Sequence, residues 1–412
     1  MFIKKNIYND YSFLVTIPLA IFPLSFLLGN LIINLNTFII VFLFLFFVIK
    51  NKNFKFFKNI HFQILIFFWF SLLINLYFST NFENSFSRVI GFLRFILLVF
   101  AIKYFFDSDK IFYKKIVFNS WILIFFIISL DLIFEFIFGY NTLGFKSYMP
   151  GRLSGFLGEE LKIGHLFIGF FLICAVTINK INKKYSILIL TILFGIFISL
   201  IIGERSNFLR FFAMCIIFLL FIDKSSFFKK IFFILISILV IFSFISINEK
   251  YNKRFYGQFL NPIIKLKNPE LLIKNTVYGA NFDRAIKIFE KNKFFGIGIN
   301  NFRIESGKEI YENKNLKFNE QGASTHPHQI HLEILCESGV FGYAIFLITM
   351  ITSIYLSLSN FFKKKNLYTL SSLLYIIFAL VPILPSGSFF TTFGATIFWI
   401  NYGLMISKNP NQ

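Results

Sequence analysis

Apolar residues fall into twelve long runs along the chain, with short polar connections between most of them. The runs lie near residues 11–29, 32–49, 60–79, 86–106, 116–138, 164–179, 186–203, 207–222, 231–247, 335–357, 368–384 and 389–406. Each is close to the roughly 20 residues that a helix needs to cross a bilayer. Backbone groups in hydrocarbon must form hydrogen bonds within their own segment, so helices are expected. The pattern predicts an all-α, polytopic membrane protein with about 12 transmembrane helices.

The charges of the connections alternate along the chain. The segments before the first run, after every second run and after the last run are rich in lysine, whereas 30–31 and 385–388 contain none. The positive-inside rule then predicts that both chain ends are cytoplasmic. We expect residues 1–247 to form nine transmembrane helices, 248–330 a large outer loop with short helices, and 331–412 the last three transmembrane helices.

Composition narrows the class of protein. Hydrophobic residues make up 57% of the 412 residues and charged residues only 15%, whereas ordinary soluble domains carry roughly 25% charged residues. This excludes a soluble protein, a disordered chain and a secreted disulfide scaffold. The net charge of +21 lies mostly in the lysine clusters between runs, so no nucleic-acid partner is expected. The three cysteines are interpreted as reduced core residues, without a metal or disulfide framework.

Residues 324–342 carry the richest set of polar side chains. Thr325 suits an N-cap and Pro327 a first helical turn, so a helix is predicted to begin here. His328 would lie at its positive end, where the dipole favours a neutral imidazole that can act as a general base. Two alternatives remain: histidines without a role at the membrane surface, or a zinc site. The zinc site would use His326, His328, His331 and Glu333. The spacing of these residues matches no standard zinc motif.

Two arginines outside the predicted spans are candidates for the site, and one of them, Arg205, suits a phosphate or diphosphate. Arg205 lies in a tight outer hairpin, Gly203-Glu204-Arg205-Ser206, and a guanidinium donates to phosphate through a bidentate fork. The alternative is an arginine that merely extends to the membrane surface. Arg284 falls beside the apolar face of a predicted helix at 281–290, before a Gly-x-Gly turn at 296–298.

Three ionisable residues fall within predicted spans. Arg94 and Asp131 are each placed roughly 10–12 Å below the outer surface by the helical rise. Because unpaired charges at that depth are costly, we expect these two side chains to pair. Glu135, one turn above Asp131, is expected to face the same outer cavity.

Taken together, these segments resemble the O-antigen ligase family, which includes related polymerases and protein-glycosylating enzymes. His328-Gln329, nine residues, Gly339, two residues and Gly342 fit the family signature. Arg205 and Arg284 look like its two functional arginines, and Gly151-Arg152-Leu153-Ser154-Gly155 is similar to a block in its outer loop. Glu204 is a departure, since the family commonly has a small residue before this arginine.

The resemblance implies a GT-C-like fold and an inverting glycosyltransferase in the bacterial cytoplasmic (inner) membrane, with a periplasmic active site and neither metal nor cofactor. The donor would be a glycan on undecaprenyl diphosphate, and the favoured acceptor a hydroxyl of lipid A-core. His328 would be the general base, and Arg205 and Arg284 would hold the diphosphate. The expected substrate contacts are Arg152, Gln329, His326 and His331, with Gly339 and Gly342 structural.

Alternatives with the same layout stay open. An O-antigen or exopolysaccharide polymerase, or a protein O-oligosaccharyltransferase of the same family, would differ in its acceptor. A lipid or sugar transporter or flippase could use Arg94, Asp131 and Glu135 as a proton relay. The sequence lacks the paired Gly- or Pro-broken helices that many transporter folds repeat between their halves.

Overall fold

The structure is a computed structural model that describes residues 10–222, 227–261, 264, 276–382 and 384–407. Within these residues the chain forms helices and no strands, so the predicted all-α class is confirmed. The long helices are α1 (Tyr11–Ala20), α2 (Phe22–Leu27), α3 (Asn30–Lys50), α4 (Ile60–Tyr77), α5 (Phe82–Phe106), α6 (Ile111–Phe138), α7 (Ile163–Asn182), α8 (Tyr185–Ile202), α9 (Arg205–Leu220), α10 (Phe227–Ile247), α16 (Ile330–Lys364), α17 (Leu367–Ala379) and α18 (Thr392–Met405).

Shorter helices occupy the segment between α10 and α16. They are α11 (Glu249–Tyr251), η4 (Asn252–Leu260), α14 (Val277–Lys291), α15 (Phe302–Glu305), η5 (Glu309–Tyr311) and η6 (Glu320–Gly322). Eight helices of the described chain are long and apolar enough to cross a membrane, with α1 and α17 among the shorter apolar ones. The polytopic membrane architecture is therefore supported, while the count of twelve spans stays a prediction.

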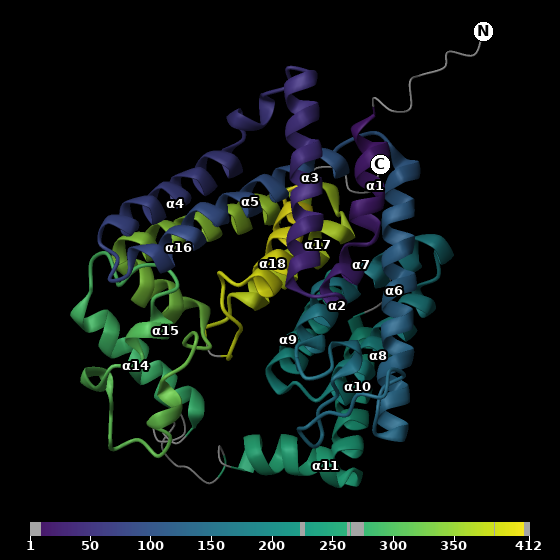
Figure 1. Cartoon of the computed structure of the whole chain (residues 1–412). Coiled ribbons are helices and arrows are strands. Elements are labelled where there is room, and N and C mark those ends of the chain that lie inside the picture. Colours follow the sequence, from purple (N-terminus) through teal and green to yellow (C-terminus); the bar gives the residue numbers. More distant parts are fainter. Residues whose placement is uncertain (1–9, 223–226, 262–263, 265–275, 383, 408–412) are drawn as a thin grey trace.

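Contacts between distant segments bring lysine-rich connections together. Lys110, before α6, forms an ion pair of 3.0 Å with Asp10, before α1. The ammonium of Lys180, at the end of α7, lies 5.2 Å from the ring centre of Tyr368, at the start of α17. In Figure 1, α1 begins at the top and α11 lies at the bottom.

The remaining connections, which include the lysine-poor segments 30–31 and 385–388, meet at the other end of the same helices. Leu153, before α7, donates its N–H to the carbonyl of Ile202 at the end of α8, at 3.0 Å. Ser386, before α18, donates its N–H to the carbonyl of His328 at 2.8 Å. Since α8 runs from one group of connections to the other, the alternating charge of the connections corresponds to two ends of the molecule.

Helix α16 is broken at Gly339, and the break is filled by the segment that precedes α15. Gly339 has φ 66° and ψ −174°, far from helical values. The carbonyls of Cys336 and Glu337 accept hydrogen bonds from the N–H groups of Ile297 and Gly298, at 3.1 and 2.9 Å. On the other side of the break, Val340 and Phe341 donate to the carbonyls of residues 293 and 294, at 2.8 and 3.2 Å. Four inter-segment hydrogen bonds thus replace those that the helix loses.

The close approach of these two segments explains their glycines. A Cβ at Gly296 would lie 2.5 Å from the carbonyl oxygen of Glu337, and one at Gly339 would lie 2.2 Å from that of Phe294. Asn75 of α4 also donates its side-chain N–H to the carbonyls of Phe295 and Glu337. The Gly-x-Gly turn and the glycine of the family signature are therefore two halves of one backbone contact.

The expected ion pair between Arg94 and Asp131 is wrong. Asp131 accepts hydrogen bonds from the backbone N–H and the hydroxyl of Thr142, in the loop after α6, at 2.9 and 2.6 Å. Arg94 donates to the hydroxyl of Thr392 at 3.3 Å, and its guanidinium lies 4.6 Å from the ring centre of Phe95. A similar depth along two helices did not fix the direction of either side chain.

Glu135 was expected to face an outer cavity, and it instead holds the loop between α6 and α7. Its carboxylate accepts hydrogen bonds from the N–H and hydroxyl of Ser154 and from the N–H of Gly155, at 2.7 to 3.1 Å. The carboxylate is buried. Its partners are all in the loop, so it does not form a relay with Asp131 and Arg94.

Candidate active site

A cavity of about 450 Å³ opens among the lysine-poor connections. Its walls come from six parts of the chain: the start of α3, the loop before α7 with the start of that helix, the α8–α9 hairpin with the first turns of α9, α14, the segment before α16, and the connection between α17 and α18 with the start of α18. The lining residues are Asn30, Arg152, Leu161, Lys162, His165, Glu204, Ser206, Asn207, Arg210, Tyr278, Thr325, His326, His328, Pro385, Ser386, Gly387, Ser388, Thr391, Phe393 and Gly394.

His328 lies directly before the N-cap of α16, and its backbone is held in an unusual conformation. Its φ is 56°, in the left-handed region that non-glycine residues adopt at a cost of about 1–3 kcal/mol. The hydrogen bond from Ser386 N–H and a second one, from Ile330 N–H to the Ser386 hydroxyl at 3.1 Å, hold it there. Burial lowers the pKa of His328 below its ordinary value. The imidazole is thus neutral near pH 7, as a general base requires.

The predicted start of α16 was four residues too early, because the N-cap is Gln329 and not Thr325. The helix begins at Ile330, and the Gln329 side chain caps it by accepting from Leu332 N–H at 2.6 Å. Thr325 and Pro327 lie outside it, in the segment whose Thr325, His326 and His328 line the cavity. The Gln329 amide also donates to the carbonyl of Pro382 at 2.9 Å, so this side chain holds backbone rather than lining the cavity.

His326 lies beside His328, with 4.1 Å between the ring centres. Its Nδ1 is 3.0 Å from the Thr325 hydroxyl, and its buried Nε2 has no hydrogen-bond partner in the structure. Burial, together with the nearby charges of His328 and Arg303, lowers the pKa of His326 to about 3. Tyr278 lies on the other side of His328, with ring centres 5.7 Å apart. The cavity therefore contains two neutral imidazoles in contact.

The guanidinium groups of Arg152, Arg205 and Arg254 lie close together. Arg152 lines the cavity, whereas the described residues that line it do not include Arg205 or Arg254. Arg205 donates to the carbonyl of Arg254 at 3.4 Å, and Arg254 donates through Nε to the carbonyl of Gly203 at 2.6 Å. Burial and the positive charges of Arg205 and Arg152 lower the pKa of Arg254 to about 10. Tyr278 interacts electrostatically with Arg205. Like charges held this closely are relieved by an anion, so the cluster of Arg152, Arg205 and Arg254 suits a phosphate-bearing ligand.

Glu204 occupies the position where the sequence departs from the family pattern. Its carboxylate forms a 3.0 Å ion pair with Arg152 and accepts from the N–H of Gly164, at the start of α7, at 3.3 Å. A Cβ at position 164 would lie 2.8 Å from the carboxyl carbon of Glu204. Glycine at 164 therefore makes room for the larger side chain, which orients Arg152 at the edge of the cavity.

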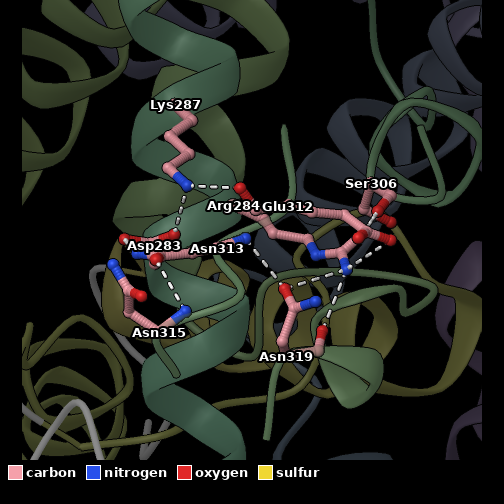
Figure 2. A network of polar contacts seen from close by, with 8 residues as sticks. All are labelled: Asp283, Arg284, Lys287, Ser306, Glu312, Asn313, Asn315 and Asn319. Atoms are coloured by element: carbon pink, nitrogen blue, oxygen red, sulfur yellow. Dashed lines mark hydrogen bonds and ion pairs between the residues drawn. The ribbon is translucent and has the colours of Figure 1, made fainter. Parts of the chain in front are cut away.

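Arg284 has a different environment from the one expected. It is 2% exposed, and the described residues that line the cavity do not include it. Figure 2 shows its guanidinium among the loop residues that follow α15: it donates to the carbonyls of Ser306 and Asn319 and lies 3.7 Å from the carboxylate of Glu312. Lys287 and Asp283 extend this network on the same helix. These contacts hold residues 306–319 against α14.

The other expected substrate contacts divide in two. Arg152 and His326 line the cavity, whereas His331 points away from it. The two ring nitrogens of His331 lie 3.1 Å from the Tyr343 hydroxyl and 2.7 Å from the carbonyl of Leu380. Glu333 accepts from the Phe389 N–H at 2.7 Å. These side chains do not converge into the zinc site that remained open, and no group of three or more His, Cys, Asp or Glu in the described chain could hold a metal ion.

Several cavity residues were not identified from the sequence. Arg210 donates to the carbonyl of Leu384 at 3.0 Å, and Lys162, His165 and Tyr278 also line the cavity. Arg254 lies behind the hairpin in the cluster described above. A signal was present for Arg210 and Arg254, since arginine is disfavoured on the outer face and the same reasoning singled out Arg205. Nothing in the sequence distinguished Tyr278 from the other tyrosines.

Comparison with known proteins gives an independent result. No curated protein sequence matches the chain significantly. Residues 188–347 match the model of a protein family described as O-antigen ligase. The matched region runs from α8 through the arginine hairpin, α14, His328 and the Gly339 break, and it contains eight of the twenty lining residues. This match, over 160 of the 412 residues, makes that part of the chain similar to the O-antigen ligase family.

Proposed function

We propose that this protein transfers a glycan from a polyprenyl diphosphate to an acceptor hydroxyl at the cavity that contains His328. The observation that carries the proposal is the composition of this cavity: a neutral imidazole from the segment before α16 and the guanidinium groups of Arg152 and Arg210 line the same space. The charges of Arg205 and Arg254 lie close to that of Arg152. The imidazole can accept a proton while the guanidinium groups stabilise an anionic leaving group.

The reaction is a single displacement. The acceptor oxygen attacks the anomeric carbon of the donor sugar, a C–O bond forms, and the bond from that carbon to the diphosphate oxygen breaks. The acceptor proton passes to His328, and the polyprenyl diphosphate leaves with the bonding electrons. Attack opposite the leaving group inverts the anomeric configuration. General-base help of this kind is typically worth about 10²–10⁴-fold in rate.

The proposed diphosphate contacts are Arg152, Arg205 and Arg254. Arg152 lines the cavity, Arg205 and Arg254 lie close enough to it for their charges to interact, and Arg210 also lines the cavity. Arg284 has a supporting role in this proposal, because its donors are occupied by the loop carbonyls. Lipid A-core is the proposed acceptor, and the lysine-poor end is the proposed periplasmic end, in keeping with the positive-inside rule.

The test is transfer by the purified His328→Ala variant in detergent, with lipid-linked glycan as donor and lipid A-core as acceptor. Transfer is expected to fall about 10²–10⁴-fold, with donor affinity within a few-fold of wild type. His61→Gln is the matched control, since His61 packs against Ser353 on α16 and does not line the cavity. Full transfer by His328→Ala would refute the proposed role of this cavity.

The acceptor is tested in a deletion strain. If the protein is a ligase that acts on lipid A-core, its deletion leaves bare core on gels of lipopolysaccharide, and lipid-linked polymer accumulates. If it is a polymerase, its deletion instead leaves core that carries a single repeat unit. The second pattern would keep the donor chemistry and replace the acceptor.

A further inference from the structure

A second cavity, of about 370 Å³, lies at the lysine-rich end of the molecule. It opens between the start of α6, the end of α7 and the start of α17, and none of its lining residues lines the cavity of the candidate active site. The lining residues are Ile111, Lys114, Lys115, Phe118, Asn119, Thr177, Lys180, Ile181 and Tyr368.

Three lysines converge on this cavity from two helices. Lys114 and Lys115 come from α6, and Lys180 comes from α7, close enough to both for their charges to interact. Lys114 is unusual because its side chain is only 3% exposed. A lysine that served only as a topological signal would extend into water, whereas this one faces an internal space.

The lining contains no carboxylate among the described residues. Asp107 and Asp109, in the connection before α6, interact electrostatically with Lys114 from outside the cavity. The positive charge facing the cavity therefore exceeds the negative charge, and the space is electrostatically complementary to an anion.

The remaining walls suit a ligand with a hydrocarbon part. Ile111, Phe118 and Ile181 are apolar, and Ile111 and Ile181 are exposed on the outer surface of the helices, where acyl chains pack. The hydroxyls of Thr177 and Tyr368 lie 2.9 Å from each other beside Lys180. Hydroxyl and ammonium groups thus lie next to apolar side chains at the edge of the cavity.

We propose that this cavity binds the phosphate group of an anionic phospholipid from the membrane leaflet at the lysine-rich end. The basic lining selects the phosphate, and the exposed isoleucines receive the acyl chains. Pockets of basic residues between membrane helices are known to bind lipid headgroups in this way. Free inorganic phosphate shares the headgroup chemistry and lacks the hydrocarbon part, so the two can be distinguished.

The experiment uses the full-length protein in a non-ionic detergent and follows its thermal midpoint. Wild type is titrated with dioleoylphosphatidylglycerol, with dioleoylphosphatidylcholine and with inorganic phosphate. The variant Lys114→Gln/Lys115→Gln/Lys180→Gln removes the basic lining. Lys52→Gln/Lys55→Gln/Lys58→Gln removes the same number of lysines from the connection before α4, outside this cavity.

Only the anionic lipid is expected to raise the midpoint of wild type and of the control variant. In the cavity variant, its half-saturating concentration should rise on the order of 100-fold, since each lysine near an anionic surface contributes appreciably to binding. An equal response of wild type and cavity variant would overturn the proposal. A response to inorganic phosphate equal to that of the anionic lipid would overturn the lipid assignment. Because glycan transfer is not the readout, failure here leaves the function proposed for the His328 cavity untouched.

Discussion

Replacing Gly339 by alanine tests the backbone contact that fixes the segment before α15 against α16. The φ of 66° with ψ of −174° lies in a region that only glycine populates without strain. The added Cβ would lie 2.2 Å from the carbonyl oxygen and 2.4 Å from the carbonyl carbon of Phe294. Both are backbone atoms, so no side-chain rotation can relieve the contact.

The cost of this change has two parts. Backbone strain in this region is about 1–3 kcal/mol, and inserting a methyl group where no space exists costs about 1–3 kcal/mol more. If residues 293–298 move away instead, the four inter-segment hydrogen bonds are lost, each with a net value of about 0.5–1.5 kcal/mol. Either route destabilises the protein by roughly 2–6 kcal/mol, a large share of the 5–15 kcal/mol typical of folded proteins.

The assay compares thermal unfolding in detergent and the amount of protein in the membrane. Gly307→Ala is the matched control in the same outer segment, because the nearest atom to its added Cβ is 3.6 Å away, an ordinary contact. Gly339→Ala should unfold at a clearly lower temperature and reach the membrane in smaller amounts, while Gly307→Ala should resemble wild type. A Gly339→Ala protein as stable as wild type would show that the contact with Phe294 does not form as described.

Three further predictions concern the charged groups. Arg284→Gln should destabilise the protein by about 3–5 kcal/mol, as loss of a buried ionic partner does. The molecules that remain folded should bind the glycan donor as tightly as wild type does. Weaker donor binding at unchanged stability would make Arg284 a donor contact. In the folded protein the pKa of His328 is lowered from 6.5, and that of His326 is lowered from 6.5 to about 3. Below about pH 6.5 the unfolded chain therefore binds more protons than the folded protein, so stability should fall as the pH drops below that value. A His326→Asn variant should lose part of this dependence, which melting curves across pH would show. Arg94→Met and Asp131→Asn should destabilise additively, within about 0.3–0.5 kcal/mol, in a double-mutant cycle, whereas strong coupling would restore the discarded ion pair.

The helical layout was readable from the sequence because it depends on one-dimensional properties. Every predicted apolar run contains a helix in the structure, and the alternating lysines correspond to two ends of the molecule. Hydrophobic length and flanking charge decide these features, with little influence from which helices are neighbours. The first run is divided between α1 and α2, with Pro23 in the first turn of α2.

The direction of side chains could not be read in the same way. Arg94 and Asp131 have similar depths, but rotation about each helix axis points Asp131 to Thr142 and Arg94 to Thr392. Arg284 lies beside an apolar helix face, as expected. That face packs into a small core with Ile297 and residues of the outer segment, which takes the arginine away from the cavity. Such packing depends on contacts between distant segments, and the spacing of residues along the chain does not indicate these contacts.

The spacing of the family signature acquires a physical meaning from these contacts. The nine residues between Gln329 and Gly339 form a rigid helical piece of about 13–14 Å at the usual rise. Within it, Glu333 accepts the Phe389 N–H, and Glu337 accepts the N–H groups of residues 300 and 302.

One end of this piece carries His328 in a strained conformation held by Ser386, and the other end docks on the Gly-x-Gly turn at 296–298. A change of one residue in its length would rotate one end by about 100° relative to the other. The imidazole would then leave the cavity, or Gly339 would leave the turn. The signature therefore encodes a fixed distance and angle between a proton-accepting side chain and the outer segment, and Gly339 serves the anchor rather than the chemistry.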